Sequence, residues 1–597
     1  MCIRDSFSGA WAREMHREQI TLSSGKFVNS SYTGTSSNRA NPFVILSPEN
    51  TCETSGSCIG CNLIYSGNHY EALEKDSYGK FRFVAGINPR SFSWQLAPGE
   101  AFYTPEAVLN FSADGFRGLS GQLHSFIREH IVRGVWKHKP RPVLLNSWEA
   151  CYFKIDEKKL LQLAKAGKNA GIELFVMDDG WFLGRNDDTS SLGDWEPDPK
   201  KLPGGIASLS KKIKELGMDF GIWVEPEMIS ENSNLYKEHP DWAMMIPGHP
   251  HSEGRNQRLL DLCNPEVQQY VIDSMTKVFS SGEIRYVKWD MNRNFSDIYS
   301  PYLPAAKQGE TAHRYVLGLY HIMDELTTRF PEILFEGCSS GGNRFDLGIL
   351  SYFPQIWASD NTDALCRTGI QNSYSYGYPL SVFTAHVSSC PNHQTLRITP
   401  LETRFQVASF GILGYECNLK DLSGSDLNAI REQIALYKKW RDVFQFGTFY
   451  RGTENEDSDS ETLSWTCVSP DGRRAVGLFF RRLTTPNQSH DWYRPVGLLP
   501  DVKYHFYGRN IKYNLKDFGD LVNTVSPVHI KQGSALQEIL SRFVNMDGEK
   551  EDLTAYGDTL MLAGIALKPA FAGTGYNSDT RLFPDFSSRI YFMEAVE

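Results

Sequence analysis

The sequence predicts a multidomain α/β and β protein with three parts: a partial N-terminal β-sandwich, a central (β/α)8 TIM barrel and a C-terminal antiparallel β domain. Its 597 residues exceed the roughly 250 to 300 residues at which one hydrophobic core stops growing. The middle of the chain alternates apolar runs with helical patterns. We expect the sandwich at 1–118, a linker helix at 119–139, the barrel at 140–445 and the last domain at 446–597.

The two ends of the chain show the pattern of short β-strands. Apolar runs that begin at Phe43 and Asn62 are separated by Gly, Ser, Asn and Pro. A helix is expected from Leu119 to Val132, because its apolar residues recur every three or four positions. After a further helix, expected at 427–441, apolar runs at 476–480 and 560–563 indicate the C-terminal β domain.

The central part indicates a barrel because eight strand-like runs alternate with helices. Asn264 and Pro265 mark the start of one helix, as its N-cap and first residue, and others are expected at 205–217 and 313–330. A doubly wound open sheet would give the same alternation, and the count of eight favours the closed barrel. The expected strands are Val143–Trp148, Leu174–Asp178, Phe220–Glu225, Arg258–Asp261, Ile284–Asp290, Ile333–Gly337, Gln355–Ser359 and Leu380–His386.

Composition narrows the classes of partner and cofactor. The formal charge of −10 argues against nucleic acid, whose phosphates need clustered Lys and Arg. No stretch approaches 18 uninterrupted apolar residues and no leader pattern is visible, so we expect a cytoplasmic protein without a membrane partner. The 11 cysteines are thinly spread, which suits reduced thiols, and the group Cys52, Cys58 and Cys61 has no nearby histidine to complete a zinc site. We expect no cofactor and no metal.

Carboxylates gather at the ends of the expected barrel strands. In a TIM barrel the residues at these ends face the active site. Clustered carboxylates repel one another, so their occurrence at four strand ends together indicates that a ligand or a cation uses them. A single one would more simply be a helix cap or a loop residue. They are Asp178, Asp179, Glu225, Glu227, Asp290, Asp360 and Asp363.

Two chemistries use such a cluster. Glycoside hydrolysis needs one carboxylate as nucleophile and another as proton donor, whereas a metal-dependent hydrolase needs histidine ligands beside the acids. The first three strands end without histidine, and we interpret His386 and His393 as structural. Trp148, Trp181, Trp223 and Trp357 place aromatic planes beside the acids, so glycoside hydrolysis is favoured.

Six long motifs, in order, resemble glycoside hydrolase family 36, the bacterial-type α-galactosidases. They are Leu-Asn-Ser-Trp-Glu-Ala at 145–150, Met-Asp-Asp-Gly-Trp-Phe at 177–182, Gly-Ile-Trp-Val-Glu-Pro-Glu-Met at 221–228, Lys-Trp-Asp-Met-Asn at 288–292, Glu-Gly-Cys-Ser-Ser-Gly-Gly at 336–342 and Trp-Ala-Ser-Asp-Asn-Thr-Asp at 357–363. The resemblance implies a retaining α-galactosidase with Asp290 as nucleophile and Asp360 as general acid/base. Its substrates would be melibiose and raffinose-type oligosaccharides.

The chemistry of the neighbouring residues agrees with this division. Lys288 and Asp290 are two positions apart on a strand, so their side chains point the same way and the ammonium would favour an ionised carboxylate. Asp360 must carry a proton when substrate arrives, and Trp357 could shield it from water.

The resemblance also assigns the sugar-binding residues. Asp178 and Asp179 would bond the galactose hydroxyls at C4 and C6, and a site built for an axial C4 hydroxyl rejects glucose. Cys338 and its neighbouring glycines would lie near the C2 hydroxyl and disfavour an N-acetyl group. The complete expected set is Trp148, Asp178, Asp179, Trp223, Arg255, Lys288, Asn292, Cys338, Gly341 and Trp357.

Some features depart from the family pattern. The N-terminal domain is short, which suggests a truncated reading frame, and Asn343 stands where glycine is common. Family members are often homotetramers, so assembly is open. The alternatives are an α-N-acetylgalactosaminidase, an α-galactosyl transferase and an inactive carbohydrate-binding fragment.

Overall fold

The computed structural model describes residues 2–37, 39–452, 460–488, 490–541, 543–571 and 580–596. The chain divides into two compact units. The first comprises residues 1–397, 408–422 and 433–437, and the second comprises 398–407, 423–432 and 438–597. The expected fold class is confirmed, because a closed parallel barrel lies between an antiparallel N-terminal part and an antiparallel C-terminal part of the chain.

The first unit begins with two antiparallel sheets. The larger has the order β2-β1-β4-β5-β8 and the smaller the order β3-β6-β7. Phe43 in the middle strand is fully buried and stacks on Phe7, with 5.3 Å between ring centroids. The strands are β1 (Cys2–Ser8), β2 (His16–Leu22), β3 (Gly25–Ser30), β4 (Ala40–Pro48), β5 (Cys58–Ile64), β6 (His69–Lys75), β7 (Phe81–Ile87) and β8 (Glu106–Ser112).

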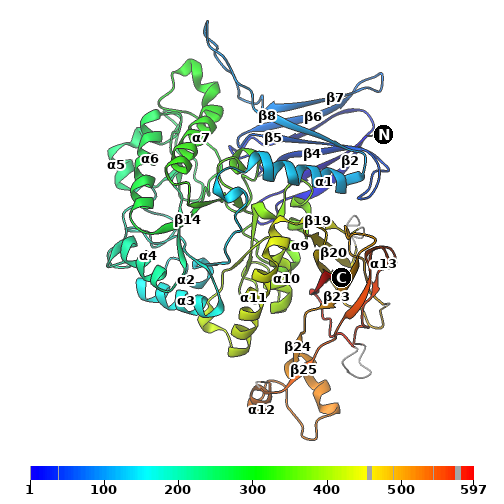
Figure 1. Ribbon diagram of the computed structural model, residues 1–597. Coiled ribbons are helices and arrows are strands. Elements are labelled where there is room, and N and C mark those ends of the chain that lie inside the picture. Colours follow the sequence, from blue (N-terminus) through cyan, green and yellow to red (C-terminus); the bar gives the residue numbers. More distant parts are fainter. Residues whose placement is uncertain are drawn as a thin grey trace. The chain divides into compact units, whose positions relative to one another are not determined.

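A helix follows the sheets, as expected. It consists of α1 (Gly115–Phe126) and one π-helical segment, η1 (Ile127–Ile131), so it begins four residues before the expected start at Leu119. Leu119, Leu123 and Ile127 form its buried face, and α1 packs against β5 and β8 (Figure 1).

Residues 144–415, all of which the structure describes, form a closed barrel of eight parallel strands. The order around it is β9-β10-β11-β14-β15-β16-β17-β18, and β18 pairs with β9. The strands are β9 (Leu144–Asn146), β10 (Leu174–Met177), β11 (Asp219–Val224), β14 (Ile284–Trp289), β15 (Leu334–Gly337), β16 (Gln355–Trp357), β17 (Phe383–Val387) and β18 (Ile412–Tyr415).

One predicted barrel strand is wrong. Arg258–Asp261 ends in an acid after two leucines, like a barrel strand, but it lies in the connection after β11. There β13 (Arg258–Leu259) pairs antiparallel with β12 (Met228–Ile229), and a parallel barrel cannot contain such a pair. The strand that closes the barrel is β18, which the sequence prediction missed. A side chain at its Gly414 would lie 2.4 Å from the His386 ring, so a residue without one is needed.

Helices cover the outside of the barrel. In Figure 1, α4 to α7 lie outside β14. The Asn264 side chain caps α6 by accepting from the Glu266 amide at 2.9 Å, with Pro265 as first residue, as predicted. The helices of the first unit in this part of the chain are α2 (Trp148–Cys151), α3 (Glu157–Ala170), α4 (Gly205–Glu215), α5 (Asn234–Glu238), α6 (Pro265–Ser280), α7 (Thr311–Arg329), α8 (Leu347–Leu350) and α9 (Ala364–Tyr374). The residues of α10 (Leu401–Ser409) and α11 (Gly424–Phe446) are divided between the two units.

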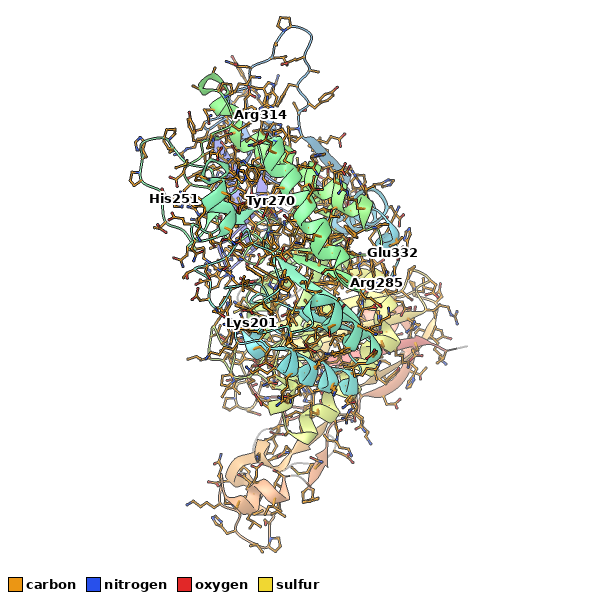
Figure 2. All side chains as sticks on the ribbon, turned by 90° about the vertical axis from the view of Figure 1, so that its left-hand side faces the viewer. Lys201, His251, Tyr270, Arg285, Arg314 and Glu332 are labelled. Atoms are coloured by element: carbon orange, nitrogen blue, oxygen red, sulfur yellow. The ribbon has the colours of Figure 1, made fainter. Side chains whose placement is uncertain are left out.

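The two ends of the barrel differ in what surrounds them. Arg285 and Glu332, at the amino ends of β14 and β15, lie on the side of the barrel opposite His251, which belongs to the long connection after β11 (Figure 2). Tyr286 fills the interior near the amino ends, in one buried cluster with Leu144 and Leu174. The interior is therefore packed near the amino ends, and the active sites of such barrels lie at the carboxyl end.

The second unit contains an antiparallel sheet with the order β19-β20-β21-β28-β23-β26 among the described residues. Its core includes Phe479, Tyr493, Phe506 and Tyr591. A small extension carries β24 (Lys512–Asn514), β25 (Asn545–Asp547) and α12 (Ala535–Leu540). The sheet strands are β19 (Thr448–Arg451), β20 (Thr462–Val468), β21 (Arg474–Arg481), β23 (Lys503–Gly508), β26 (Asp552–Tyr556) and β28 (Ser587–Ala595). Within the described residues, every helix is too short or too polar to cross a membrane.

Candidate active site

A cavity lies at the carboxyl ends of the barrel strands, within the first unit. Ten of the twelve predicted site residues line it: Trp148, Asp178, Asp179, Trp223, Arg255, Lys288, Asp290, Asn292, Trp357 and Asp360. Cys338 and Gly341 do not line it. The lining also contains residues that were not predicted as site residues: Trp11, Glu149, Phe153, Arg185, Asp188, Thr362, His393, Gln394 and Glu416.

Asp290 directly follows β14 and accepts hydrogen bonds on both carboxylate oxygens. Oδ2 accepts from Trp223 Nε1 at 3.2 Å and from Asn292 Nδ2 at 2.9 Å. Oδ1 accepts from the amides of Met291 at 2.8 Å and Ser340 at 3.3 Å. The carboxylate is only 6% exposed, and these donors fix its orientation toward the cavity.

The charge of Asp290 is stabilised by its surroundings. Burial raises the pKa of Asp290, but the Lys288 ammonium and the hydrogen bonds outweigh burial and bring the pKa below its ordinary value. Lys288 itself forms an ion pair with Asp178, with 3.0 Å between Nζ and Oδ2. The ammonium therefore favours the ionised form of Asp290 while it bonds directly to Asp178.

Asp360 has the opposite electrostatic setting. Burial and the negative charge of Asp290 raise its pKa. Two indole groups donate to it, Trp11 Nε1 to Oδ2 at 2.8 Å and Trp357 Nε1 to Oδ1 at 2.9 Å, and both bonds act against this rise. Trp357 therefore does more than shield the carboxyl from water, because its donated hydrogen bond favours the ionised form.

Asp179 is held by an arginine that the sequence did not indicate. Arg185 binds the carboxylate at two points, with 3.0 Å from Nε to Oδ1 and 2.8 Å from Nη2 to Oδ2. Burial nevertheless raises the pKa of Asp179, against the effect of the Arg185 charge. Asp178, beside it, accepts from Asn146 Nδ2 at 2.7 Å. The two adjacent acids are thus fixed by separate partners, and both face the cavity.

Cys338 and Gly341 lie behind the cavity wall. Cys338 is buried, its thiol hydrogen-bonds to Asp290, and burial together with the Asp290 charge raises the pKa of the thiol. Gly341 has a φ of +81°, and a side chain there would lie 2.9 Å from the Asp360 amide nitrogen. Asn343 does not line the cavity either, and its side chain donates to the Ser340 carbonyl at 3.1 Å.

Other acids of the strand-end cluster are structural. Glu227 accepts from Trp289 Nε1 at 2.8 Å and pairs with Arg344 at 2.7 Å. Glu225 is buried beneath the cavity and accepts from the Asn292 amide at 2.6 Å. Burial and the charge of Asp290 raise the pKa of Glu225 to about 8. These two carboxylates support the cavity and do not line it.

The histidines near the mouth pair with acids. His386 Nδ1 lies 2.9 Å from Glu416 Oε2, and His393 Nδ1 lies 3.2 Å from Glu149 Oε1. His386 is buried, whereas His393 lines the cavity, so only the first is purely internal. In the described part of the chain no His, Cys, Asp and Glu side chains are grouped so that they could hold a metal ion.

Three sequence-family profiles match the chain in order along its length. They are the glycosyl hydrolase family 36 N-terminal domain at residues 5–97, melibiase at residues 101–447 and the glycosyl hydrolase family 36 C-terminal domain at residues 462–593. The chain belongs to glycosyl hydrolase family 36. The resemblance inferred from the six motifs is confirmed, and this family 36 chain is a glycoside hydrolase.

Similar proteins include bacterial α-galactosidases. The α-galactosidase AgaA of Geobacillus stearothermophilus is 45% identical over 503 residues, which are 84% of this chain and 69% of that protein. The α-galactosidase 1 of Pediococcus pentosaceus is 46% identical over 496 residues, or 83% and 67% of the two chains. A crystal structure of an AgaA variant in complex with raffinose has a TM-score of 0.88 at 41% identity and covers 100% of this chain and 75% of that chain.

Proposed function

We propose that this family 36 enzyme is a retaining α-galactosidase that removes terminal α-galactose from oligosaccharides such as melibiose and raffinose. The observation that supports it most directly is the pair Asp290 and Asp360 in one cavity, with the pKa of the first lowered and that of the second raised. A double displacement needs this combination of an ionised and a protonated carboxyl. The names of the similar bacterial proteins support the galactose specificity.

In the first step Asp290 attacks the anomeric carbon and the bond to the leaving sugar breaks. Asp360 gives its proton to the glycosidic oxygen, so the leaving group departs as a neutral alcohol. In the second step Asp360, now ionised, takes a proton from water, and the water oxygen displaces Asp290 from the anomeric carbon. Two inversions restore the α configuration.

Recognition of galactose is assigned to the paired acids after β10. Asp178 and Asp179 would accept hydrogen bonds from the hydroxyls at C4 and C6. Their ion pairs with Lys288 and Arg185 hold them in place before the sugar binds. A sugar with an equatorial C4 hydroxyl would leave these buried acceptors unpaired, which is a strong basis for discrimination.

The roles of the two carboxyls are tested by azide rescue. Asp290→Ala with an activated aryl α-galactoside and azide should yield the β-galactosyl azide, because azide replaces the nucleophile and inverts the centre once. Asp360→Ala with azide should yield the α-galactosyl azide, because azide then attacks the enzyme-linked intermediate. If each variant gave the other product, the two assignments would be reversed.

The substrate class is tested by direct comparison. We expect p-nitrophenyl α-galactoside to be hydrolysed faster than the corresponding N-acetylgalactosaminide, and water to be preferred over raffinose as acceptor. Preference for the N-acetyl substrate, or transfer as the main reaction, would favour one of the alternative activities. Cytoplasmic location and homotetrameric assembly stay predictions.

A further inference from the structure

The connection between β1 and β2 reaches the active site from the N-terminal domain. Trp11, in this connection, is the residue that donates to Asp360. Two of its other residues, Ala12 and Met15, have φ values of 62° and 59°, which are unfavourable for residues with a side chain. Such conformations persist only where surrounding contacts hold them.

Glu14 joins this connection to the segment that carries Asp360. Its Oε1 accepts from the Ala12 amide at 3.2 Å, and its Oε2 accepts from the Ser359 hydroxyl. The same hydroxyl oxygen accepts from the Asn361 amide at 3.0 Å, and Asn361 Nδ2 donates to the Ala12 carbonyl at 3.1 Å. Glu14 is 5% exposed, so water competes little for these bonds.

Gly341 closes this contact from a third side. A Cβ there would lie 2.7 Å from Glu14 Oε1 and 2.9 Å from the Asp360 amide nitrogen. The three segments therefore meet without room for an additional methyl group. A change at Glu14 would be transmitted directly to the backbone that carries Asp360.

We infer that Glu14 is a positioning residue for the general acid/base: it locks the N-terminal connection to residues 359–361, and its charge favours the protonated form of Asp360. The inference rests on the proposed function, which makes Asp360 the proton donor. Glu14 does not line the cavity, so it acts through Asp360 and not on the sugar. A buried carboxyl is costly to ionise, and here both of its oxygens accept hydrogen bonds, which an amide side chain with one acceptor oxygen cannot reproduce.

The titration of Glu14 gives this role a pH signature. Burial raises the pKa of Glu14 to about 7, against the hydrogen bond from Ser359. As the pH rises through that value, a negative charge appears beside Asp360, raises its pKa and delays the loss of its proton. The other titratable or charged groups that act on Glu14 or Asp360 are Arg367, Tyr374, Asp290, Lys288, Cys338 and His393.

The test compares Glu14→Gln with the wild-type enzyme on two substrates over a pH series. Melibiose needs a proton on its leaving sugar, whereas an activated aryl α-galactoside, with a more acidic leaving group, needs little help. We expect kcat/KM for melibiose to fall about tenfold and the value for the aryl substrate to change far less. The basic limb of the melibiose profile should move to lower pH, because the negative charge that retains the proton is missing.

Two further variants distinguish a specific effect on Asp360 from a general loss of folding. Glu71→Gln makes the same chemical change at another buried carboxyl of the N-terminal domain, which pairs with His69 and not with the barrel. Glu71→Gln should leave unchanged both the ratio of the kcat/KM values for the two substrates and the basic limb of the melibiose pH profile. Ser359→Ala keeps Glu14 but breaks its bond to the segment of Asp360, and should reproduce the substrate-dependent loss. Thermal unfolding of each variant measures the structural cost.

The outcomes separate the two proposals. If wild-type enzyme does not hydrolyse either α-galactoside, the proposed function fails. If the wild-type enzyme is active and Glu14→Gln lowers kcat/KM equally for both substrates, only the role of Glu14 is overturned. The same holds if Glu14→Gln leaves the basic limb of the melibiose pH profile in place. A substrate-dependent loss in Glu14→Gln and Ser359→Ala, absent from Glu71→Gln, supports it.

Discussion

Asp290 and Asp360 face one cavity, but the two regions that hold them are built differently. Asp290 is fixed by the barrel itself, through its own strand end, the ends of neighbouring strands and the buried Lys288. Asp360 depends in addition on the N-terminal domain, through Trp11. The proposed nucleophile is therefore held by the barrel alone, whereas the proposed proton donor depends on the contact between two domains. This difference can be tested by substitution.

The largest loss of activity is expected from a change at Asp290, the proposed nucleophile. Asp290→Ala should lower kcat by at least about a thousandfold on every α-galactoside, because the covalent route is lost. Asp360→Ala should be severe on melibiose but much milder on an activated aryl substrate. Steady-state kinetics on both substrates check this. As a control, Asp261→Asn alters a buried carboxyl outside the cavity and should leave the preference between the two substrates unchanged. Equal losses of activity on both substrates for Asp360→Ala would contradict the assignment of Asp360 as proton donor.

A smaller loss of activity is expected from a change at Arg185, the ion-pair partner of Asp179. Arg185→Ala removes the ion-pair partner of Asp179, and burial then raises the pKa of that acid further. We expect kcat/KM to fall about tenfold or more, mainly through a higher KM, because an ordered hydrogen-bond acceptor is lost. Initial rates over a galactoside series measure it. Arg258→Ala removes an ion pair with Glu231 outside the cavity and is the control. An unchanged KM in Arg185→Ala would exclude this role.

A modest effect is expected from the N-terminal domain. Trp11→Phe keeps an aromatic ring but removes the donor to Asp360, and one hydrogen bond to a charged group is worth about 2 kcal/mol. That bond lowers the pKa of Asp360, so its loss raises the pKa and moves the basic limb of kcat/KM to higher pH. This is opposite to the shift expected for Glu14→Gln. A pH profile of kcat/KM measures it, and a shift to lower pH would contradict the proposed contact.

The smallest effect is expected from a chelator. The double displacement uses two carboxyl groups and needs no metal ion. EDTA should therefore leave kcat and KM for p-nitrophenyl α-galactoside unchanged after dialysis. Loss of activity that Zn²⁺ or Mg²⁺ restores would instead support the metal-dependent hydrolase.

The barrel strands show which parts of the fold could be predicted from the sequence. Seven barrel strands were found because each is a short apolar run, and six of them have an acid or tryptophan near the end; β17 ends in His386 and Val387 instead. The eighth strand, β18, was missed although Glu416 directly follows Ile412–Tyr415, and Arg258–Asp261 was mistaken for a barrel strand because it shows the same apolar run followed by an acid. The connections on both sides of Arg258–Asp261 are long enough for a parallel crossover, so only the observed antiparallel pairing of β13 with β12 separates the two segments.

The sequence by itself determined the strand-end motifs, which contain nine of the ten predicted residues that line the cavity, because residues at one end of parallel strands must meet around a closed barrel. The tenth, Arg255, was assigned by the family resemblance alone. Only the tertiary structure decided that Glu225 and Glu227 are supporting groups, that Arg185 holds Asp179, and that Trp11 reaches Asp360 across 349 positions. Local periodicity reports which face of an element is buried. It carries no record of contacts between distant segments, and these contacts set the charge of each carboxyl.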